Sequence, residues 1–175
     1  MPTAQFRTVD SPVGPLTLAG QGRRLMHLRM ADQTYEPSHD GWEPDETAFP
    51  DAVEQLEEYF AGTRTEFELE LELVGTAFQR RVWGALLTIP YGETRSYSEV
   101  AESIAAPAAV RAVAGACARN RVSLVIPCHR VVRGTGALGG YRWGLARKER
   151  LLAREHGFAA RRVESRERPV TRPSR

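Results

Sequence analysis

The chain has 175 residues, of which 42% are hydrophobic and 26% are charged, the balance of an ordinary soluble globular protein. At about 150 residues per domain, this length allows one domain or two small ones. No apolar run approaches the roughly 18–20 residues of a membrane helix. The first residues also lack the basic and apolar segments of a secretory signal. We therefore expect a cytoplasmic protein with no membrane partner.

The two cysteines, Cys117 and Cys128, are too few for a disulfide scaffold or a cysteine-rich zinc site. Both are expected to be free thiols in a reducing compartment. His27 and His39 have no thiolate in their half of the chain, so isolated surface or core positions are favoured over metal ligation. The sequence predicts no metal site.

Charge is distributed unevenly along the chain. Residues 1–74 carry 15 acidic and 5 basic side chains, whereas residues 75–175 carry 7 acidic and 19 basic ones. Residues 75–158 alone have a net charge of +8. A basic half beside an acidic half indicates a polyanionic partner on one face. Docking of the two halves against each other is the alternative.

Strands are predicted in the acidic half. The run SPVGP, residues 11–15, indicates a turn between two short strands. Met26, Leu28 and Met30 alternate with polar residues, as in a half-buried strand. The run TEFELELEL, residues 65–73, alternates strictly and gives the clearest strand pattern in the chain. Its glutamate face is not expected to meet a nucleic acid.

One helix is predicted between these strands. Residues 31–50 are polar and are expected to form a long loop. Val53, Leu56 and Phe60 then share one helical face, and Gly62 is a suitable C-cap.

After Gly75 the apolar period becomes helical. Thr76 and Gln79 form a capping-box pattern, and the helix that they open ends before Pro90. Its apolar stripe consists of Phe78, Val82, Leu86 and Ile89.

Two short helices separated by a tight turn follow. Ser96 and Glu99 form a second capping box, which opens a helix through about Ile104. Pro107 suits the first position of the next helix, which is expected to end near Asn120. The apolar face of that helix consists of Val110, Val113, Ala114 and Cys117. This arrangement is typical of a helix-turn-helix, although many helical hairpins bind nothing.

The end of the chain combines an apolar segment, a loop and a helix. Residues 121–132 are apolar, and residues 134–144 are glycine-rich and predict an irregular loop. A last helix carries Leu145, Lys148, Leu151, Leu152 and Glu155. Residues 159–175 are basic and polar, and are expected to form a disordered tail.

Cys128 is the candidate for chemistry. A free thiol titrates near ~8.5, so only a few per cent is the reactive thiolate at neutral pH. His129 or Arg130 could lower that pKa or accept the proton. Adjacent side chains point apart in extended backbone, so His129 would act from a turn or through one water. Composition alone leaves open a reactive thiol and an inert buried cysteine.

The run from Ile126 to Val132, IPCHRVV, resembles the active-site motif of the O6-alkylguanine-DNA alkyltransferases, the methylated-DNA–protein-cysteine methyltransferase family, in its bacterial form. Three flanking blocks resemble the family in order and spacing, at residues 76–101, 109–120 and 139–155. The resemblance is close over residues 76–156 and looser over residues 1–74.

The resemblance implies an α+β fold with two domains. Residues 1–74 are expected to form an acidic, ribonuclease-H-like α/β domain with a small antiparallel sheet and a helix. Residues 75–158 are expected to form a mostly helical domain that holds the helix-turn-helix and the active site, followed by the tail.

The resemblance also implies the catalytic roles. Cys128 is expected to attack the alkyl carbon in line while guanine leaves. His129 is expected to take the thiol proton through water, and Glu155 to orient His129. Tyr97 is expected to donate a hydrogen bond to the departing base. Without the resemblance, a solvated helix residue is favoured for Glu155, whereas a partly buried core aromatic and a hydrogen-bond donor to the base are equally supported for Tyr97.

The target base lies inside a stacked duplex, so it must be flipped out at a cost of a few kcal/mol. Arg111 matches the family's intercalating arginine, with an ordinary phosphate contact as the alternative. Ala112 and Gly115 are small and allow close approach in the minor groove, against the usual major-groove docking. Asn120 matches the hinge residue before the active-site segment and is expected to hold its turn by side-chain hydrogen bonds.

Further residues match the base pocket by resemblance. The backbone of Cys128 and Val131 is expected to read the guanine edge, and the Arg142 amide to reach O6. Tyr141 is expected in the pocket wall and Lys148 near the active-site loop. Trp143 follows Arg142 where some members carry small residues, and the pair is expected to narrow the pocket. Cys117 is expected in the core.

The implied function is DNA repair by a single-turnover methyltransferase. An alkyl group passes irreversibly from O6-alkylguanine, or from O4-alkylthymine, in double-stranded DNA to Cys128. No cofactor is expected, because the substrate carries its own electrophilic carbon. A monomer is expected, with cooperative binding along DNA left open. The competing hypotheses are a non-catalytic damage-binding protein, which would lack the cysteine, and a cysteine hydrolase or redox sensor, which would not explain the basic half.

Overall fold

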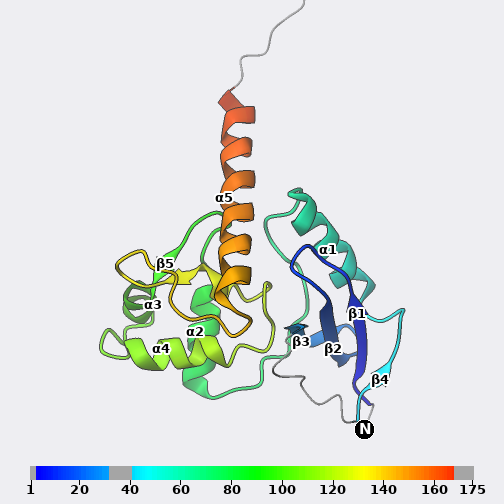
Figure 1. The fold of residues 1–175 in the computed structure, drawn as a ribbon. Helices are drawn as coiled ribbons and strands as arrows, with labels where there is room; N and C mark the ends of the chain where they lie inside the picture. The colour runs from blue at the N-terminus through cyan, green and yellow to red at the C-terminus, as the bar shows by residue number, and fades with distance from the viewer. Residues whose placement is uncertain (1–2, 32–40, 168–175) are drawn as a thin grey trace, which may run out of the picture.

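The computed structural model describes residues 3–31 and 41–167. The strands are β1 (Gln5–Val9), β2 (Leu16–Gln21), β3 (Arg24–Met30), β4 (Glu43–Pro44), β5 (Arg95–Ser96) and β6 (Val131–Val132). The helices are α1 (Pro50–Ala61), α2 (Ala77–Leu86), α3 (Tyr97–Ser103), α4 (Val110–Ala118) and α5 (Leu145–Glu167), with a 3₁₀ turn, η1, at Cys128–Arg130. The sheet of β1–β4 and α1 lie on one side of α5, and α2, α3 and α4 on the other (Figure 1).

The first half forms a four-stranded sheet in the order β3-β2-β1-β4. The predicted turn at residues 11–15 joins β1 to β2, and β1, β2 and β3 are antiparallel as expected. The predicted antiparallel sheet is nevertheless mixed, because β4 pairs with β1 in parallel. β4 also lies within residues 31–50, which were expected to be loop only. His39 lies outside the described residues.

Strand β3 departs from the predicted alternation at a bulge. Leu28 and Met30 are buried, but Leu25 replaces Met26 as the third inward residue. The register shifts between Ala19 and Gly20, which pair with His27 and Leu25. The extra residue in β3 moves Met26 off the core face.

The prediction of a strand over residues 65–73 is wrong. The segment is extended and keeps its alternation, with half-buried Phe67, Leu69 and Leu71, but it makes only an isolated bridge between Leu71 and Leu25. The Leu25 amide donates to Glu70 O and the Glu72 amide donates to Leu25 O. Alternation of apolar and polar residues shows which face of a segment is buried. It does not show whether the neighbouring strand has a free edge long enough for a continuous series of backbone hydrogen bonds.

Helix α1 fulfils the prediction made for it. Leu56 and Phe60 are buried and Val53 is half-buried. Gly62 caps the helix in the left-handed region, with φ 79°, and its amide donates to carbonyls of the last turn.

Both predicted capping boxes are present. Thr76 and Gln79 exchange side-chain and backbone hydrogen bonds at the start of α2, and Ser96 and Glu99 do the same at α3. The Trp83 indole donates to Ala116 O at 2.9 Å and so fixes α2 against α4.

Helix α4 begins later than predicted. Pro107 lies in the turn rather than at the first helical position, and that turn includes Ala105 at φ 57°. Ala116, not Ala114, faces the core beside Val113 and Cys117.

The segment after α4 docks on the first half. The Leu28 amide donates to Arg121 O at 2.9 Å, and the Ser123 amide donates to Leu28 O at 3.2 Å. The edge of β3 is therefore shared between residues 70–72 and 121–123. Leu124 is buried at φ 69°, where the chain turns back toward Cys128.

Helix α5 is longer than the sequence suggested. It continues through residues 159–167, so the expectation of a disordered tail is wrong there; residues 168–175 lie outside the described residues. The Arg154 guanidinium donates to Phe60 O at 2.6 Å and Arg162 donates to Gly62 O. These contacts lie at the carboxyl end of α1, where cations are favourable.

The two halves dock through hydrogen bonds such as those from Arg154 and Arg162, and not through ion pairs. Between described residues, each ion pair joins two residues of the same half. Within the described part of the chain, no helix is long and apolar enough to cross a membrane.

Leu28→Ala tests the junction between the halves. Leu28 is fully buried, so its truncation should lower the free energy of unfolding by about 2–5 kcal/mol in urea titrations. Leu145→Ala, at a position 52% exposed, is the control and should change it by less than about 0.5 kcal/mol. Equal effects would contradict the placement of Leu28 in the core.

Candidate active site

The thiol of Cys128 lies at the start of η1 and is 7% exposed. The Asn120 side-chain amide donates to Cys128 Sγ at 3.2 Å and to Ile126 O at 2.8 Å. Asn120 Oδ1 accepts from the Val122 amide at 2.9 Å. One buried side chain thus holds the end of α4, the following turn and the thiol together.

Burial raises the pKa of Cys128 above the ordinary thiol value, against a smaller lowering by the Asn120 hydrogen bond and the Lys148 charge. The thiol is therefore protonated at neutral pH. A reaction at its sulfur requires a nearby base to accept the proton.

The imidazole of His129 is completely buried next to Cys128 in sequence. Its Nε2 lies 2.7 Å from Oε1 of Glu155, whose side chain is also buried. His129 Nδ1 is buried and has no hydrogen-bond partner within the described part of the protein. The ring is thus fixed on one nitrogen and has its other nitrogen available.

Glu155 is bound by more groups than the sequence suggested. Arg130 donates from Nε to Oε2 and from Nη2 to Oε1, both at 2.9 Å, and the Tyr59 hydroxyl donates to Oε1 at 2.8 Å. Burial alone would raise the pKa of Glu155, but His129 and Arg130 lower it to about 2. The carboxylate is therefore ionised in the folded protein.

Lys148 is buried, and not a solvated helix residue. Its Nζ donates to Val131 O at 2.6 Å and to Gly140 O at 3.1 Å. Burial lowers the pKa of Lys148. The Val131 amide donates to Cys128 O, so both backbone groups of Val131 have partners inside the protein.

A cavity of about 540 Å³ opens at Cys128. It brings together five residues singled out from the sequence, which are Tyr97, Arg111, Cys128, Tyr141 and Arg142. Val110, Ala114, Cys117, Ala118, Arg133 and Gly140 complete its lining. A volume of this size suits a small organic group such as a nucleobase.

Tyr97 is the first residue of α3, directly after the Ser96 cap. Burial raises its pKa to about 12, with a further contribution from the two thiols, so its hydroxyl is a donor at neutral pH. Gly139, at φ 71°, packs against it, because an added Cβ would lie 3.1 Å from the Tyr97 ring. The glycine permits the loop to close on the tyrosine.

The remaining predicted residues lie elsewhere. Ala112 is exposed and Gly115 half-exposed on α4, and neither lines the cavity. Trp143 does not narrow the cavity, because it is buried and its Nε1 donates to Ser123 Oγ at 2.7 Å. Cys117 is buried as expected but also lines the cavity.

The sequence alone gave no role, or a different role, to three residues of the site: Tyr59, Arg130 and Arg133. Arg130 was considered as a neighbour of the thiol, but its guanidinium binds Glu155 and Ile89 O. Tyr59 is 96 residues from Glu155, and no local pattern relates them. Arg133 follows the motif directly, and its charge was the available signal. Among the described residues, no group of three or more histidines, cysteines or carboxylates could hold a metal.

Comparison with known proteins gives consistent matches over both halves. Residues 77–157 match "6-O-methylguanine DNA methyltransferase, DNA binding domain", and residues 5–73 match the "ribonuclease-like domain" of the same proteins. The chain is 59% identical over 154 residues to a methylated-DNA–protein-cysteine methyltransferase of Mycobacterium bovis, covering 88% of this chain and 93% of the relative. A protein of that name from Methanosarcina acetivorans is 45% identical, with coverage of 86% and 97%.

Solved structures agree. The structure of Mycobacterium tuberculosis OGT in complex with DNA has a TM-score of 0.84 and 55% identity, covering 88% of this chain and 94% of that one. An O6-methylguanine-DNA methyltransferase from Pyrococcus kodakaraensis, 23% identical with a TM-score of 0.62, shares the fold.

Glu155→Gln tests the buried carboxylate. The pKa of Glu155 in the folded protein, about 2, lies below the ordinary 4.5, so its stabilisation is complete above pH 4.5 and is lost as the pH falls toward 2. The difference in unfolding free energy between wild type and variant should therefore shrink by about 3 kcal/mol over that interval. Urea titrations at several pH values measure it. Glu102→Gln, on the exposed side of α3, should cost little at any pH, and a difference that is constant with pH for Glu155→Gln would contradict the ionised carboxylate.

Proposed function

The chain belongs to the methylated-DNA–protein-cysteine methyltransferase family, and from that premise we propose that Cys128 is the cysteine that it methylates. The protein acts in DNA repair by transferring a methyl group from O6-alkylguanine in DNA to cysteine. The observation that carries the assignment is a buried thiol that lines a cavity large enough for a nucleobase and is followed in the chain by a histidine fixed by a carboxylate.

The proton balance of the transfer follows from this geometry. Cys128 Sγ forms a bond to the alkyl carbon while the bond from that carbon to guanine O6 breaks. The thiol proton passes through one water to Nδ1 of His129, which has no other described partner. Glu155 orients the ring and stabilises its charged form. Tyr97 donates a hydrogen bond to the base as negative charge develops on guanine.

The transfer happens once per molecule. A thioether carries no good leaving group, so a second thiolate would be needed to remove the methyl group. Cys117 lines the same cavity, but burial and then the neighbouring Cys128 raise its pKa to about 12. Cys117 therefore stays protonated, and unlike Cys128 it is not followed in the chain by a histidine that could accept its proton.

The helix-turn-helix of α3 and α4 binds the duplex, with α4 in the minor groove. Arg111 is exposed near the start of α4 and lines the cavity, which suits a side chain that replaces a flipped base. The small residues Ala112 and Gly115 allow the backbone of α4 to approach the DNA closely. The basic side chains of the second half contact the phosphates. Asn120 serves as the hinge, and Val131, Tyr141, Arg142 and Lys148 shape the base site.

The remaining parts of the proposal concern organisation. Residues 1–74 and 75–158 form the two domains, which is supported by the separate family matches to 5–73 and 77–157. In this proposal the protein acts as a cytoplasmic monomer on DNA.

Intact-mass and peptide analysis after incubation with duplex DNA containing O6-methylguanine tests the nucleophile. The wild type should gain the mass of one methyl group, on the peptide that holds residue 128. Cys128→Ala should gain none and keep its affinity for DNA, because the backbone and DNA-binding surface are unchanged. Cys117→Ala, at the other thiol of the cavity, should still be methylated. Repair of the lesion with residue 128 unmodified would overturn the assignment.

Arg111→Ala tests base flipping. Methyl transfer from a fully paired duplex should fall on the order of tenfold, because unstacking costs a few kcal/mol. A mismatched or single-stranded target should recover part of the rate. The control is Arg95→Ala, whose guanidinium pairs with Glu93 and does not line the cavity. Equal impairment on paired and mismatched targets would show that Arg111 only contacts phosphate.

A further inference from the structure

The Tyr59 hydroxyl connects the first half of the chain to the buried carboxylate of the second. It lies on α1 and donates to Glu155 Oε1 at 2.8 Å, and the same oxygen lies 2.7 Å from His129 Nε2. We infer that Tyr59 is a positioning residue for the transfer, which acts on His129 through Glu155. The inference rests on the proposed function and adds the first half of the chain to its active site.

The geometry leaves the carboxylate little freedom. Oε1 receives hydrogen bonds from Tyr59 and Arg130 and lies against His129, while Oε2 accepts from Arg130 Nε. Loss of the Tyr59 donor would leave one side of Oε1 without a partner in a buried site. Burial and then the charge of Glu155 raise the pKa of Tyr59 well above its ordinary value. Its hydroxyl is therefore a donor throughout the working range of pH.

Tyr59 is itself held firmly. The carboxyl end of α1 is tied to α5 by Arg154, which donates to Phe60 O, and by Arg162, which donates to Gly62 O. The Tyr59 ring packs at 5.5 Å from Phe67 and edge-on at 6.1 Å from Tyr91. α1 therefore cannot slide along α5 without moving the hydroxyl away from Glu155.

The Tyr59 hydrogen bond should change the proton affinity of His129 in one direction. Each donor to Glu155 withdraws negative charge from the carboxylate and weakens its attraction for protonated His129. Removal of the Tyr59 hydroxyl strengthens that attraction, so His129 retains its proton to higher pH. The titratable and charged groups that interact with Glu155 are Tyr59 from α1, Tyr91 from the segment before β5, His129 and Arg130 from η1, and Tyr141 from the loop before α5.

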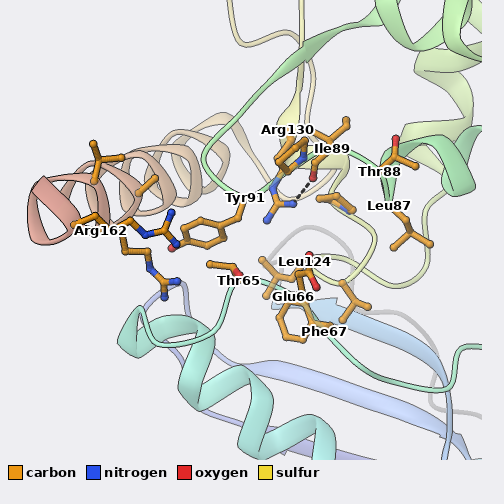
Figure 2. A pocket seen from close by; sticks show the side chains of 16 residues that line it. Thr65, Glu66, Phe67, Leu87, Thr88, Ile89, Tyr91, Leu124, Arg130 and Arg162 are labelled. Carbon is orange, nitrogen blue, oxygen red and sulfur yellow. Dashed lines mark hydrogen bonds between the residues drawn. The ribbon is translucent and has the colours of Figure 1, made fainter.

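Tyr91 supplies a matched control in the same cluster. Figure 2 shows it between Arg162 and Arg130 in a second cavity, of about 740 Å³, which shares no lining residue with the cavity at Cys128. The Arg130 guanidinium carbon lies 5.6 Å from the Tyr91 ring centre. Tyr91 is half-buried, and in the described structure its hydroxyl makes no hydrogen bond to Glu155. Tyr91→Phe thus removes a nearby hydroxyl without removing a donor to the carboxylate.

The test compares single-turnover rate constants of methyl transfer at saturating O6-methylguanine duplex, as a function of pH. In Tyr59→Phe the rate constant should fall about tenfold, which corresponds to about 1.4 kcal/mol, near the low end of what a hydrogen bond to a charged group contributes. The midpoint of the acid side of the profile should move to higher pH, and the Kd for DNA should not change. Tyr91→Phe should keep the wild-type profile. A Tyr59→Phe profile with the wild-type midpoint would overturn the inference, even if the rate were lower.

A second variant and a spectroscopic readout separate this inference from the proposed function. Replacement of Tyr59 by 3-fluorotyrosine keeps the hydroxyl as a stronger donor and should move the midpoint to lower pH. Nitrogen-15 NMR of labelled histidine follows His129 without any methyl transfer and should show both shifts. An unchanged His129 titration in both variants overturns the positioning role. Absence of methylation at wild-type Cys128 would instead overturn the proposed function.

Discussion

The carboxylate of Glu155 is an ionised group in the protein interior, where an unpaired charge would cost several kcal/mol. It is tolerated because two separate parts of the chain supply its partners, Tyr59 from α1 and both His129 and Arg130 from η1, while Glu155 itself lies on α5. Each of these elements must be in place before the charge is satisfied. The same contacts fix His129, the residue after Cys128, so in the proposed mechanism the condition for a stable interior is also the condition for a reactive site.

Cys128 and the pair of His129 and Glu155 are held in place by different contacts. Asn120 fixes Cys128 through the turn after α4, and Lys148 ties β6 to the following loop by two carbonyls. The cavity above the thiol is then lined by α3, α4 and the loop at residues 133–142. In the proposed function, the elements that carry the DNA-binding residues therefore also form the walls of the base site. Binding and chemistry share one rigid group of elements, as a reaction on a flipped base requires.

Local patterns predicted much of this arrangement and long-range contacts accounted for the rest. The capping boxes at Thr76 and Ser96 and the cap at Gly62 depend on residues within one turn, so they could be read from the chain. Cys128, His129 and Glu155 were proposed from the motif and its spacing, and the structure places His129 Nε2 and Glu155 Oε1 2.7 Å apart. The strand expected at residues 65–73 failed because alternation reports burial and not pairing. Residues 159–167 were judged by their polarity, but arginines such as Arg162 reach carbonyls of α1 and support helix there. The role of Tyr59 could not be predicted from the sequence, because its partner Glu155 is 96 residues away.

The shared edge of β3 restricts how the chain can be divided. On this edge Leu25 makes backbone hydrogen bonds to residues 70–72, and Leu28 makes them to residues 121–123. Through Leu28, the backbone groups of each half therefore complete those of the other. A truncation at Gly75 would leave the Leu28 amide and carbonyl on this edge without their partners. Exposed edges of that kind recruit other strands. The two halves, although matched separately by their relatives, are thus poor candidates for independent expression or for exchange as interchangeable modules.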